Sequence, residues 1–481
     1  MTHPAAERQH HNVTLAVLVF AGVAFALQQT MVIPALPVLQ HEFDTTTAWA
    51  TWLLTGFLLS ASVATPLVGK LGDQYGKERL LVISLSIFFL GSVAAVFAPG
   101  IGVLIACRIL QGVGAAVFPL SFSIIRDEFP PEKVPIAVGA VSSVFAIGGG
   151  LGLVLSGVIL DSFSWRWIFG LGAFAVAIAV VLVHLFVPES PIKTPSRVDV
   201  IGAVLLSAGL IALLLSLTEG ESWGWSSGRI VGLFGVGAVL LVAWGLVELR
   251  VPEPMVDMRM LARRPVFFAN LAALIGGAAM FGAFVLVPTL LQLPNGLPDE
   301  LAELADYGFG ADATTTGLYL LPSAVTGLAS GPLAGLMGRR WGSKWPLSLG
   351  MALASVGLGV LAEWHSEPWQ IVLGMLILGA GLPMTFAGMA TIIVETVRPS
   401  ETGVATGMNT VMRTIGGVIG GQVGAAILTA KTIGDTPVPS EAAFSTAFWI
   451  SAAGTAIAAV IALLITPRAR RARTQAVVET A

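Results

Sequence analysis

Long apolar runs, separated by short polar breaks, constrain this chain more than any other feature of its sequence. Each run is close to the roughly 20 apolar residues that an α-helix needs to cross a lipid bilayer, and we count about fourteen of them. Hydrophobic residues make up 55% of 481 positions and charged residues only 11%, which excludes a water-soluble globular protein. The sequence therefore predicts an all-α, multi-pass membrane protein. The runs lie near residues 13–35, 48–68, 80–98, 101–122, 136–160, 167–187, 200–218, 229–248, 267–291, 314–337, 346–363, 370–393, 404–429 and 444–466.

Two polar stretches divide the runs into groups of six, two and six, one after the sixth run and one after the eighth. We therefore expect residues 1–190 to form an N-terminal six-helix bundle. Residues 191–264 would be a linker with two additional transmembrane helices, and residues 265–481 a C-terminal six-helix bundle with a basic cytoplasmic tail. Duplicated halves with a substrate site between them are typical of secondary transporters.

The basic residues predict the orientation in the membrane. If the N-terminus is cytoplasmic, the inside loops hold nearly all loop Lys and Arg residues, and the outside loops hold only Arg166, Arg229 and Lys431. Such an excess marks the cytoplasmic side. We therefore expect a protein of the cell (inner) membrane with both termini cytoplasmic. The arginines of the tail, from Arg468 to Arg473, would lie near anionic lipid.

The sequence gives little indication of nucleic-acid binding, metal binding or catalysis. The net charge of −3 gives no indication of nucleic-acid binding. His10 and His11 have no further metal ligands beside them, and Cys107, the only cysteine, is expected to be a packing residue. We found no convincing H-E-x-x-H or G-x-S-x-G motif and no paired intramembrane acids. We expect no cofactor, no metal and no enzymatic activity.

One polar break carries a distinctive motif, G-x-L-x-D-x-x-G-K-x-R, from Gly69 to Arg79. It resembles the signature between spans two and three of the major facilitator superfamily. An ordinary positive-inside hairpin would explain the basic residues, but not the three glycines and the acid in this order. The resemblance implies a tight loop that controls conformational change, with Gly69, Asp73, Gly76, Lys77 and Arg79 as its gating residues.

A weaker copy of this motif follows span ten, from Gly335 to Lys344. Gly338 stands there near the place of the acid. We therefore expect the charge network of the gate to lie in the first half only.

The fourth span adds a second motif. Arg108 to Ala116 reads R-x-x-Q-G-x-G-A-A and, with about fourteen spans, the chain resembles the drug:proton antiporter branch of that superfamily. The resemblance implies that Arg108 takes part in proton coupling. An arginine within a membrane helix is costly unless it finds acceptors or water. The alternative is that Arg108 only bonds backbone carbonyls or holds neighbouring helices together.

Arg126 and Asp127 follow at the predicted cytoplasmic end of the same span. The resemblance implies that they join the Asp73 segment in a gate. We expect Asp73 to pair either with Arg126 or with the N-terminus of a facing helix when the inner side is closed.

The fifth span resembles the antiporter signature G-x-x-x-G-P-x-x-G-G in the spacing of Gly148, Gly152 and Gly157, but Leu153 replaces the proline and Ser156 a glycine. A helix without the proline keeps its hydrogen-bond ladder and should be straight. The glycines have an alternative role in close helix packing.

The first span lacks an acidic residue that could take part in proton coupling. Relatives often carry an acid after the leucine that corresponds to Leu27, whereas this chain has Gln28, whose amide cannot titrate. No acid lies at mid-membrane among the predicted spans. Asp127, Asp73, Asp161 or Glu395 would handle the proton, or coupling differs from that of the family.

Polar, aromatic and cationic residues of several spans are candidates for a substrate cavity. Rings accept varied lipophilic ligands, although lipid contact or helix packing is the commoner role for any one of them. Arg413 could instead snorkel to the cytoplasmic boundary. If it faces the cavity, two arginines and few acids would favour neutral or anionic substrates. The candidates are Gln28, Gln29, Trp52, Phe57, Gln111, Phe118, Phe145, Phe281 and Arg413.

Together with these patterns, the resemblance implies a major-facilitator-type fold of two six-helix bundles plus two additional helices, central in the chain. The expected function is export of a small lipophilic drug-like or metabolite molecule by alternating access, driven by protons across the lipid bilayer, and carried out by a monomer. The alternatives are a dedicated exporter or facilitator of one metabolite, lipid or anion, and a membrane receptor without transport.

Overall fold

The computed structural model describes residues 11–193, 199–293, 307–433 and 438–465. His10 and the arginines of the tail lie outside these ranges. Within them, fourteen helices are long and apolar enough to cross a membrane, which confirms the predicted spans. Helices prevail because a bilayer offers no water to the backbone N–H and C=O groups, which must bond within the segment.

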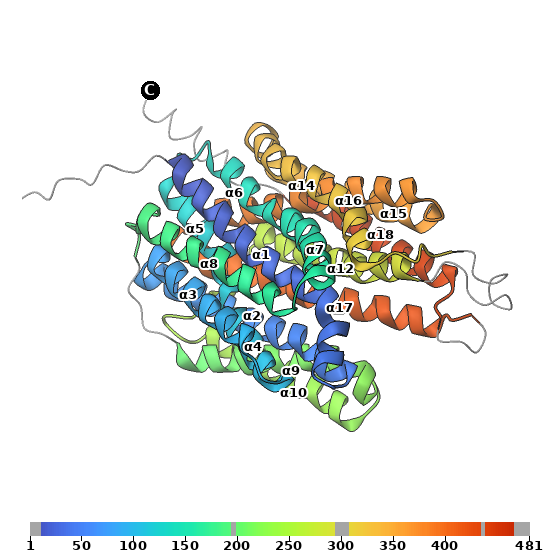
Figure 1. Ribbon diagram of the computed structural model, residues 1–481. Coiled ribbons are helices and arrows are strands. Elements are labelled where there is room, and N and C mark those ends of the chain that lie inside the picture. Colours follow the sequence, from blue (N-terminus) through green and yellow to red (C-terminus); the bar gives the residue numbers. More distant parts are fainter. Residues whose placement is uncertain (1–10, 194–198, 294–306, 434–437, 466–481) are drawn as a thin grey trace, which may run out of the picture.

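The helices of the first half run alternately up and down through the bundle (Figure 1). The fourth span consists of α4 and α5, joined by a 3₁₀ turn at Val113–Ala116, and the fifth consists of α6 and α7, which meet at Ser143. Their bounds are α1 His11–Glu42, α2 Thr47–Tyr75, α3 Lys77–Val96, α4 Ile101–Gly112, α5 Val117–Glu128, α6 Val134–Ser142, α7 Val144–Ser162 and α8 Arg166–Phe186.

The remaining helices supply the two additional spans and the second half. Two of them, α9 and α10, pack against each other, and α9 also contacts α2 and α17, so this pair covers a seam between the halves. Their bounds are α9 Val200–Trp223, α10 Gly228–Glu248, α11 Met258–Leu261, α12 Arg264–Gln292, α14 Ala313–Trp341, α15 Lys344–Glu363, α16 Pro368–Thr396, α17 Thr402–Ala430 and α18 Glu441–Leu463.

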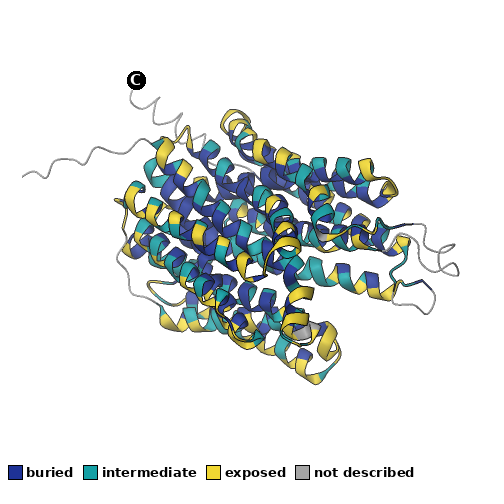
Figure 2. Cartoon of the chain, viewed as in Figure 1, coloured by how far each residue is buried: buried dark blue, intermediate teal, exposed yellow. Residues whose placement is uncertain are grey.

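Each half has its own apolar core, and buried residues fill the centre of the molecule while exposed ones face outward (Figure 2). Phe25 and Phe88 belong to the core of the first half, and Met351 and Phe444 to that of the second. Because exposed large apolar side chains occur throughout the outer helix faces, these faces suit a lipid solvent.

The halves meet mainly where the fifth span, α6 and α7, packs on α14 and where α2 packs on α17. Small residues allow the backbones to approach closely there. A β-carbon at Gly139 would lie 2.1 Å from the carbonyl oxygen of Gly331, and one at Gly69 would lie 2.5 Å from that of Gly403. The contact between the halves is therefore shaped by glycine.

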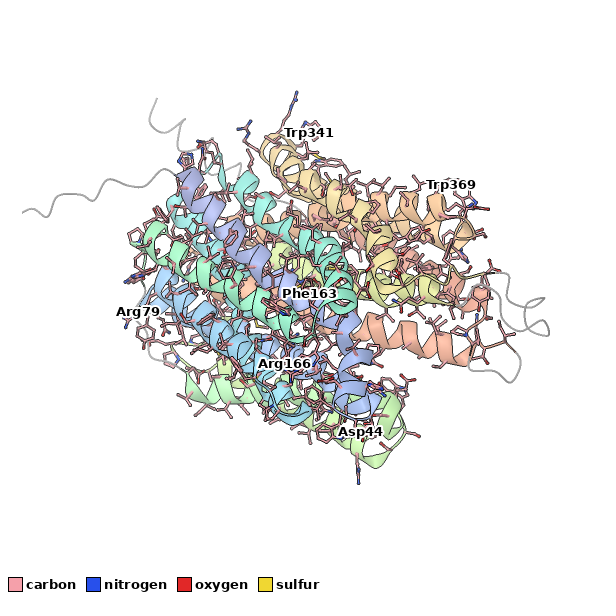
Figure 3. All side chains as sticks on the ribbon, viewed as in Figure 1. Asp44, Arg79, Phe163, Arg166, Trp341 and Trp369 are labelled. Carbon is pink, nitrogen blue, oxygen red and sulfur yellow. The ribbon has the colours of Figure 1, made fainter. Side chains whose placement is uncertain are left out.

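The segment from Gly69 to Arg79 is not the loop that the sequence indicated. Helix α2 continues to Tyr75 and α3 begins at Lys77, so Gly76 alone makes the turn. It has a φ of 124°, which glycine adopts without a β-carbon clash. Asp73 therefore sits on the last turn of a helix, which fixes its direction. Arg79 is exposed at this end of the bundle, opposite the end that carries Arg166 (Figure 3).

Gly76→Ala is expected to destabilise the protein more than Gly342→Ala. Gly342, with a φ of 98°, makes the equivalent turn before α15, but a β-carbon there meets nothing within 4 Å. A β-carbon at Gly76 would lie 2.2 Å from the carboxylate of Glu189. The strained backbone conformation should cost about 1–3 kcal/mol in both variants, and displacement of Glu189 about 1 kcal/mol more in the first. Thermal unfolding of the purified protein measures this order, and equal melting temperatures would contradict it.

Candidate functional site

The end of α2 and the beginning of α17 are joined by a buried carboxylate. Asp73 accepts hydrogen bonds from the backbone N–H of Gly403 at 3.0 Å and of Val404 at 3.3 Å. Glu401, the residue before α17, makes no side-chain cap bond of its own. Asp73 therefore caps α17 from the other half of the molecule, where the N-terminal end of the helix dipole favours a negative charge. This is the second of the two partners expected from the sequence.

A cation makes the complementary contact beside it. The guanidinium of Arg126 donates to the backbone oxygen of Val397, the C-cap residue that follows α16, at 2.7 Å, and to the hydroxyl of Thr402 at 2.8 Å. A positive charge suits the C-terminal end of a helix as a negative charge suits its N-terminal end. We call Asp73, Arg126 and the helix ends they bind the latch.

Residues of the first half hold the latch charges in place. Lys77 forms an ion pair with Asp127 and lies 3.7 Å from Asp73, and the hydroxyl of Ser190 also donates to Asp127. The carboxylate of Glu189 accepts hydrogen bonds from the backbone N–H groups of Glu78 and Arg79, both at 3.3 Å, at the beginning of α3. These contacts all lie within the first half.

A cavity of about 60 Å³ lies between the halves. Its wall is mostly apolar and includes six phenylalanines. Its charged residue is Arg413, whose guanidinium carbon lies 4.0 Å from the ring centre of Phe145. Six of the nine predicted cavity residues line it. The lining consists of Phe25, Ala26, Gln29, Thr30, Ile33, Phe57, Leu58, Ala61, Ala115, Phe118, Phe145, Met280, Phe281, Phe284, Thr410, Arg413 and Thr414.

A second cavity of about 460 Å³ adjoins the first. Thr30, Ile33 and Phe284 line both, and Pro37, which precedes the end of α1, and Gln292, which ends α12, mark its far side. Because α1 begins and α2 ends at the latch end, the second cavity lies between the first and the opposite end of the bundle. The structure is thus closed at the latch and hollowed on the other side.

The remaining three predicted cavity residues lie elsewhere. Gln28 and Gln111 are fully buried in a network around Ser92: Gln28 donates to the Ser92 hydroxyl at 2.8 Å and Gln111 donates to it at 3.2 Å. They fail to reach the cavity because their helix faces point toward α3. Trp52 packs partly buried against a separate apolar cluster that contains Leu53.

Arg108 belongs to the same hydrogen-bond network, through its bond to Gln111. It donates to the Gln111 side-chain oxygen at 2.7 Å and to the backbone oxygen of Leu53 at 3.1 Å, and its guanidinium lies 4.3 Å from the ring centre of Phe57. No carboxylate among the described residues pairs with it. Arg108 therefore joins helices and stands behind a wall of the cavity.

The family model of the Major Facilitator Superfamily matches residues 18–305 and 301–480. The chain belongs to the Major Facilitator Superfamily. It is thus a membrane transporter rather than an enzyme.

Relatives within the superfamily include efflux proteins. The chain is 27% identical over 400 residues to the multidrug resistance protein B homolog of Mycobacterium tuberculosis, covering 81% of this chain and 71% of that protein. It is 25% identical over 397 residues to the tetracenomycin C resistance and export protein of Streptomyces glaucescens, covering 82% and 71%. The crystal structure of the human organic anion transporter MFSD10 shares the fold, with a TM-score of 0.65 at 15% identity, covering 94% of this chain and 99% of that one.

In this superfamily member the glycines of the fifth span line a helix packed between two others. A β-carbon at Gly148 would lie 2.3 Å from that of Ala26 in α1, and one at Gly157 would lie 2.6 Å from the hydroxyl of Thr314 in α14. Gly152 similarly faces Thr30. The helix runs without interruption through them, as expected from the missing proline, and its break falls earlier, at Ser143.

The other candidate acids lie away from the cavity. Asp161 is exposed at the end of α7 and accepts a hydrogen bond from the Thr314 hydroxyl at 2.8 Å. Glu395 is exposed near the end of α16, where its carboxylate accepts from the Ser343 hydroxyl at 3.0 Å. In the described part of the chain, no group of three or more His, Cys, Asp or Glu residues could hold a metal ion.

The sequence analysis did not identify several residues of these contacts, among them Glu189, Ser190, Gly403 and Ser92. Glu189 and Ser190 stand between two prolines directly after span six, within the polar stretch that indicates a domain boundary. Gly403 begins a span within the run Thr-Gly-Val-Ala-Thr-Gly, whose small residues signal close approach. Ser92 lies in an apolar span with no signal besides its own polarity.

Gly69→Ala is expected to open the latch, since its new methyl group would collide with the backbone of Gly403. Distances between spin labels at Tyr75 and Pro399, on the background Cys107→Ser, measure the opening. We expect the longer distance to gain population by roughly tenfold, the equivalent of about 1.4 kcal/mol. Gly102→Ala is the matched control, because a β-carbon at Gly102 meets nothing within 4 Å. An unchanged distance distribution would show that the halves do not depend on this contact.

Proposed function

We propose that this transporter exports lipophilic small molecules by alternating access, in exchange for protons. The N-terminal bundle, residues 1–190, and the C-terminal bundle, residues 265–481, would rock around the aromatic cavity, while the helices of residues 191–264 stay at the periphery. The observation that carries this proposal is the latch: polar contacts between the halves close one end of a cavity that continues toward the other. The multidrug and tetracenomycin efflux proteins among the relatives support export of lipophilic cargo.

The latch end is proposed to face the cytoplasm. Lys70, Lys77, Arg79 and Arg126 gather there, whereas Arg166 lies at the opposite end, and such a distribution is typical of cytoplasmic and external sides. Both termini would then be cytoplasmic, in the inner membrane of a bacterial-type cell. The structure would represent a state closed to the inside, in which a single chain forms the complete path.

Protons are proposed to act at the latch. Asp73 and Asp127 are buried, lie beside Lys77 and stand where the halves must separate. Opening would change the solvent access and partners of Asp73, which is the requirement for coupling protonation to conformation. Asp161 and Glu395 are less suited because both are exposed. Arg108 would support the fold of the first half.

A second candidate is a facilitator that moves substrate without protons. It is favoured by the network of Gln28, Ser92, Gln111 and Arg108, which joins three helices of the first half without a titratable carboxylate. An exporter dedicated to one metabolite, lipid or anion would share this geometry.

Asp73→Asn is expected to lower transport by roughly tenfold, because an amide loses the charge-to-dipole attraction to α17. Efflux of the neutral dye N-phenyl-1-naphthylamine from energised cells measures transport, with the membrane level of the protein determined in parallel. Asp44→Asn is the control: Asp44 lies in the exposed turn between α1 and α2 with a φ of 44°, which asparagine tolerates. Full efflux in the Asp73 variant would contradict a gating role of this residue.

Proton coupling makes a separate prediction. In proteoliposomes with a pH-sensitive dye inside, addition of substrate should move protons in the wild type, and Asp127→Asn should reduce that movement by at least about tenfold. Gln28→Asp restores the family's acid and tests whether that position can couple as well. Substrate flux without proton movement in the wild type would favour the facilitator.

A further inference from the structure

The central cavity holds a cation without an anionic partner. Arg413 is the charged residue of the lining, and neither cavity wall contains an Asp or Glu among its described residues. Within the described ranges, the guanidinium of Arg413 makes no ion pair and no hydrogen bond. A charge removed from water without such partners is costly, so a ligand that supplies a negative charge would be favoured.

Aromatic rings, and no carboxylate among the described residues, surround the guanidinium of Arg413. The guanidinium carbon of Arg413 lies 4.0 Å from the ring centre of Phe145, 5.1 Å from Phe386 and 6.0 Å from Phe118. Ring faces attract a cation, but more weakly than an anion does in the same surroundings. Phe145 and Phe118 belong to the first half, while Arg413 and Phe386 belong to the second. The rings therefore hold the cation in the cavity without neutralising it.

A neutral donor stands in the same wall. The amide of Gln29 makes no hydrogen bond within the described part of the chain, so its N–H groups are available to a ligand. The hydroxyl groups of Thr410 and Thr414 instead donate to backbone oxygens of their own helix. Among the described residues of this lining, the polar side chains without a hydrogen-bond partner are thus Arg413, which can only donate, and Gln29, whose amide can donate through its N–H groups and accept through its oxygen.

A second arginine, Arg108, adds to the positive electrostatic potential of the cavity. Arg108 stacks on Phe57, whose ring forms part of the cavity wall, and it has no carboxylate partner among the described residues. Two unneutralised guanidinium groups in a medium of low dielectric make the potential in the cavity positive. A cationic ligand would meet repulsion there.

We propose that this cavity binds lipophilic organic anions: molecules with a flat apolar body and one carboxylate or sulfonate group. The anionic group would bind Arg413 and Gln29, and the apolar body would lie against Phe281 and Phe284 and extend into the cavity of about 460 Å³. This inference rests on the proposed function, since it names the class of substrate for the same cavity. It implies a charge selectivity that a cavity lined by rings alone would lack.

Three probes with one ring system test it: 2-naphthoate, 2-naphthalenemethanol and 2-naphthylmethylammonium. Their binding to the full-length transporter in lipid nanodiscs is measured by titration calorimetry at neutral pH, with empty nanodiscs as the blank. We expect wild type to bind the anion roughly ten- to hundredfold more tightly than the alcohol, as for a hydrogen bond to a charged group, and to bind the cation most weakly.

Variants of the cavity identify the cause. Arg413→Gln should bind naphthoate no more tightly than the alcohol, whereas Arg413→Lys should keep a preference for the anion with lower affinity, because lysine lacks the guanidinium fork. Gln29→Glu places a carboxylate in the same cavity and should also abolish the preference, which provides the test if Arg413→Gln does not fold. Arg229→Gln removes an exposed arginine from the first turn of α10 and should leave all three affinities unchanged.

Equal affinities for the three probes, a preference for the cation, or an anion preference that survives in Arg413→Gln would overturn this inference. Export of N-phenyl-1-naphthylamine by a wild type that binds none of the three probes would also overturn this inference. The proposed function would then stand. Preferential binding of naphthoate by a protein that exports neither compound would instead overturn the proposed function and leave an anion site.

Discussion

The closed end of this transporter depends on one carboxylate, Asp73, placed on the first N–H groups of a helix in the other half. Helix ends inside a membrane protein carry unpaired polar groups that need a partner. Asp73 supplies it for α17, and Arg126 does the same, with opposite charge, for the end of α16. Both contacts depend on close approach, which the glycine pair Gly69 and Gly403 permits. A seal made in this way is strong when dry and weakens once water reaches it, so it can open without disturbing either apolar core.

The sequence was sufficient for the helical fold and the number of spans, because the apolar length of a span is set by the bilayer itself. It left open whether Asp73 pairs with Arg126 or with a helix N-terminus, and the structure has the helix N-terminus. It failed at the boundary of α2, since glycines and charges mark a break in hydropathy, whereas the helix continues through them to Tyr75. It also could not assign helix faces. Gln28 and Gln29 are neighbours in sequence, yet Gln28 joins the buried network with Ser92 and Gln29 lines the cavity.

The two intramembrane arginines have different surroundings in the structure. Arg108 finds acceptors in Gln111 and the backbone of Leu53, so its charge is part of how the first half holds together. Arg413 lies beside three rings and lines the central cavity. The distinction arises from packing between the halves, because Phe145 and Phe118 reach it from helices distant in sequence, and no local pattern encodes that meeting.

The latch charges are one-sided, and this limits the cost of opening. Asp73, Lys77, Arg126 and Asp127 all belong to the first half, whereas the second half contributes helix ends and the hydroxyl of Thr402. When the halves separate, Asp73 loses the N–H groups of α17 but keeps Lys77 at 3.7 Å, and water can reach the freed groups. Separation would therefore leave no unpaired charge buried in either half. A buried ion pair divided between the halves would leave such a charge, and this makes it costly to break. A latch with charges divided between the halves would hold more tightly and release more slowly, so the one-sided arrangement suits the alternating access proposed above.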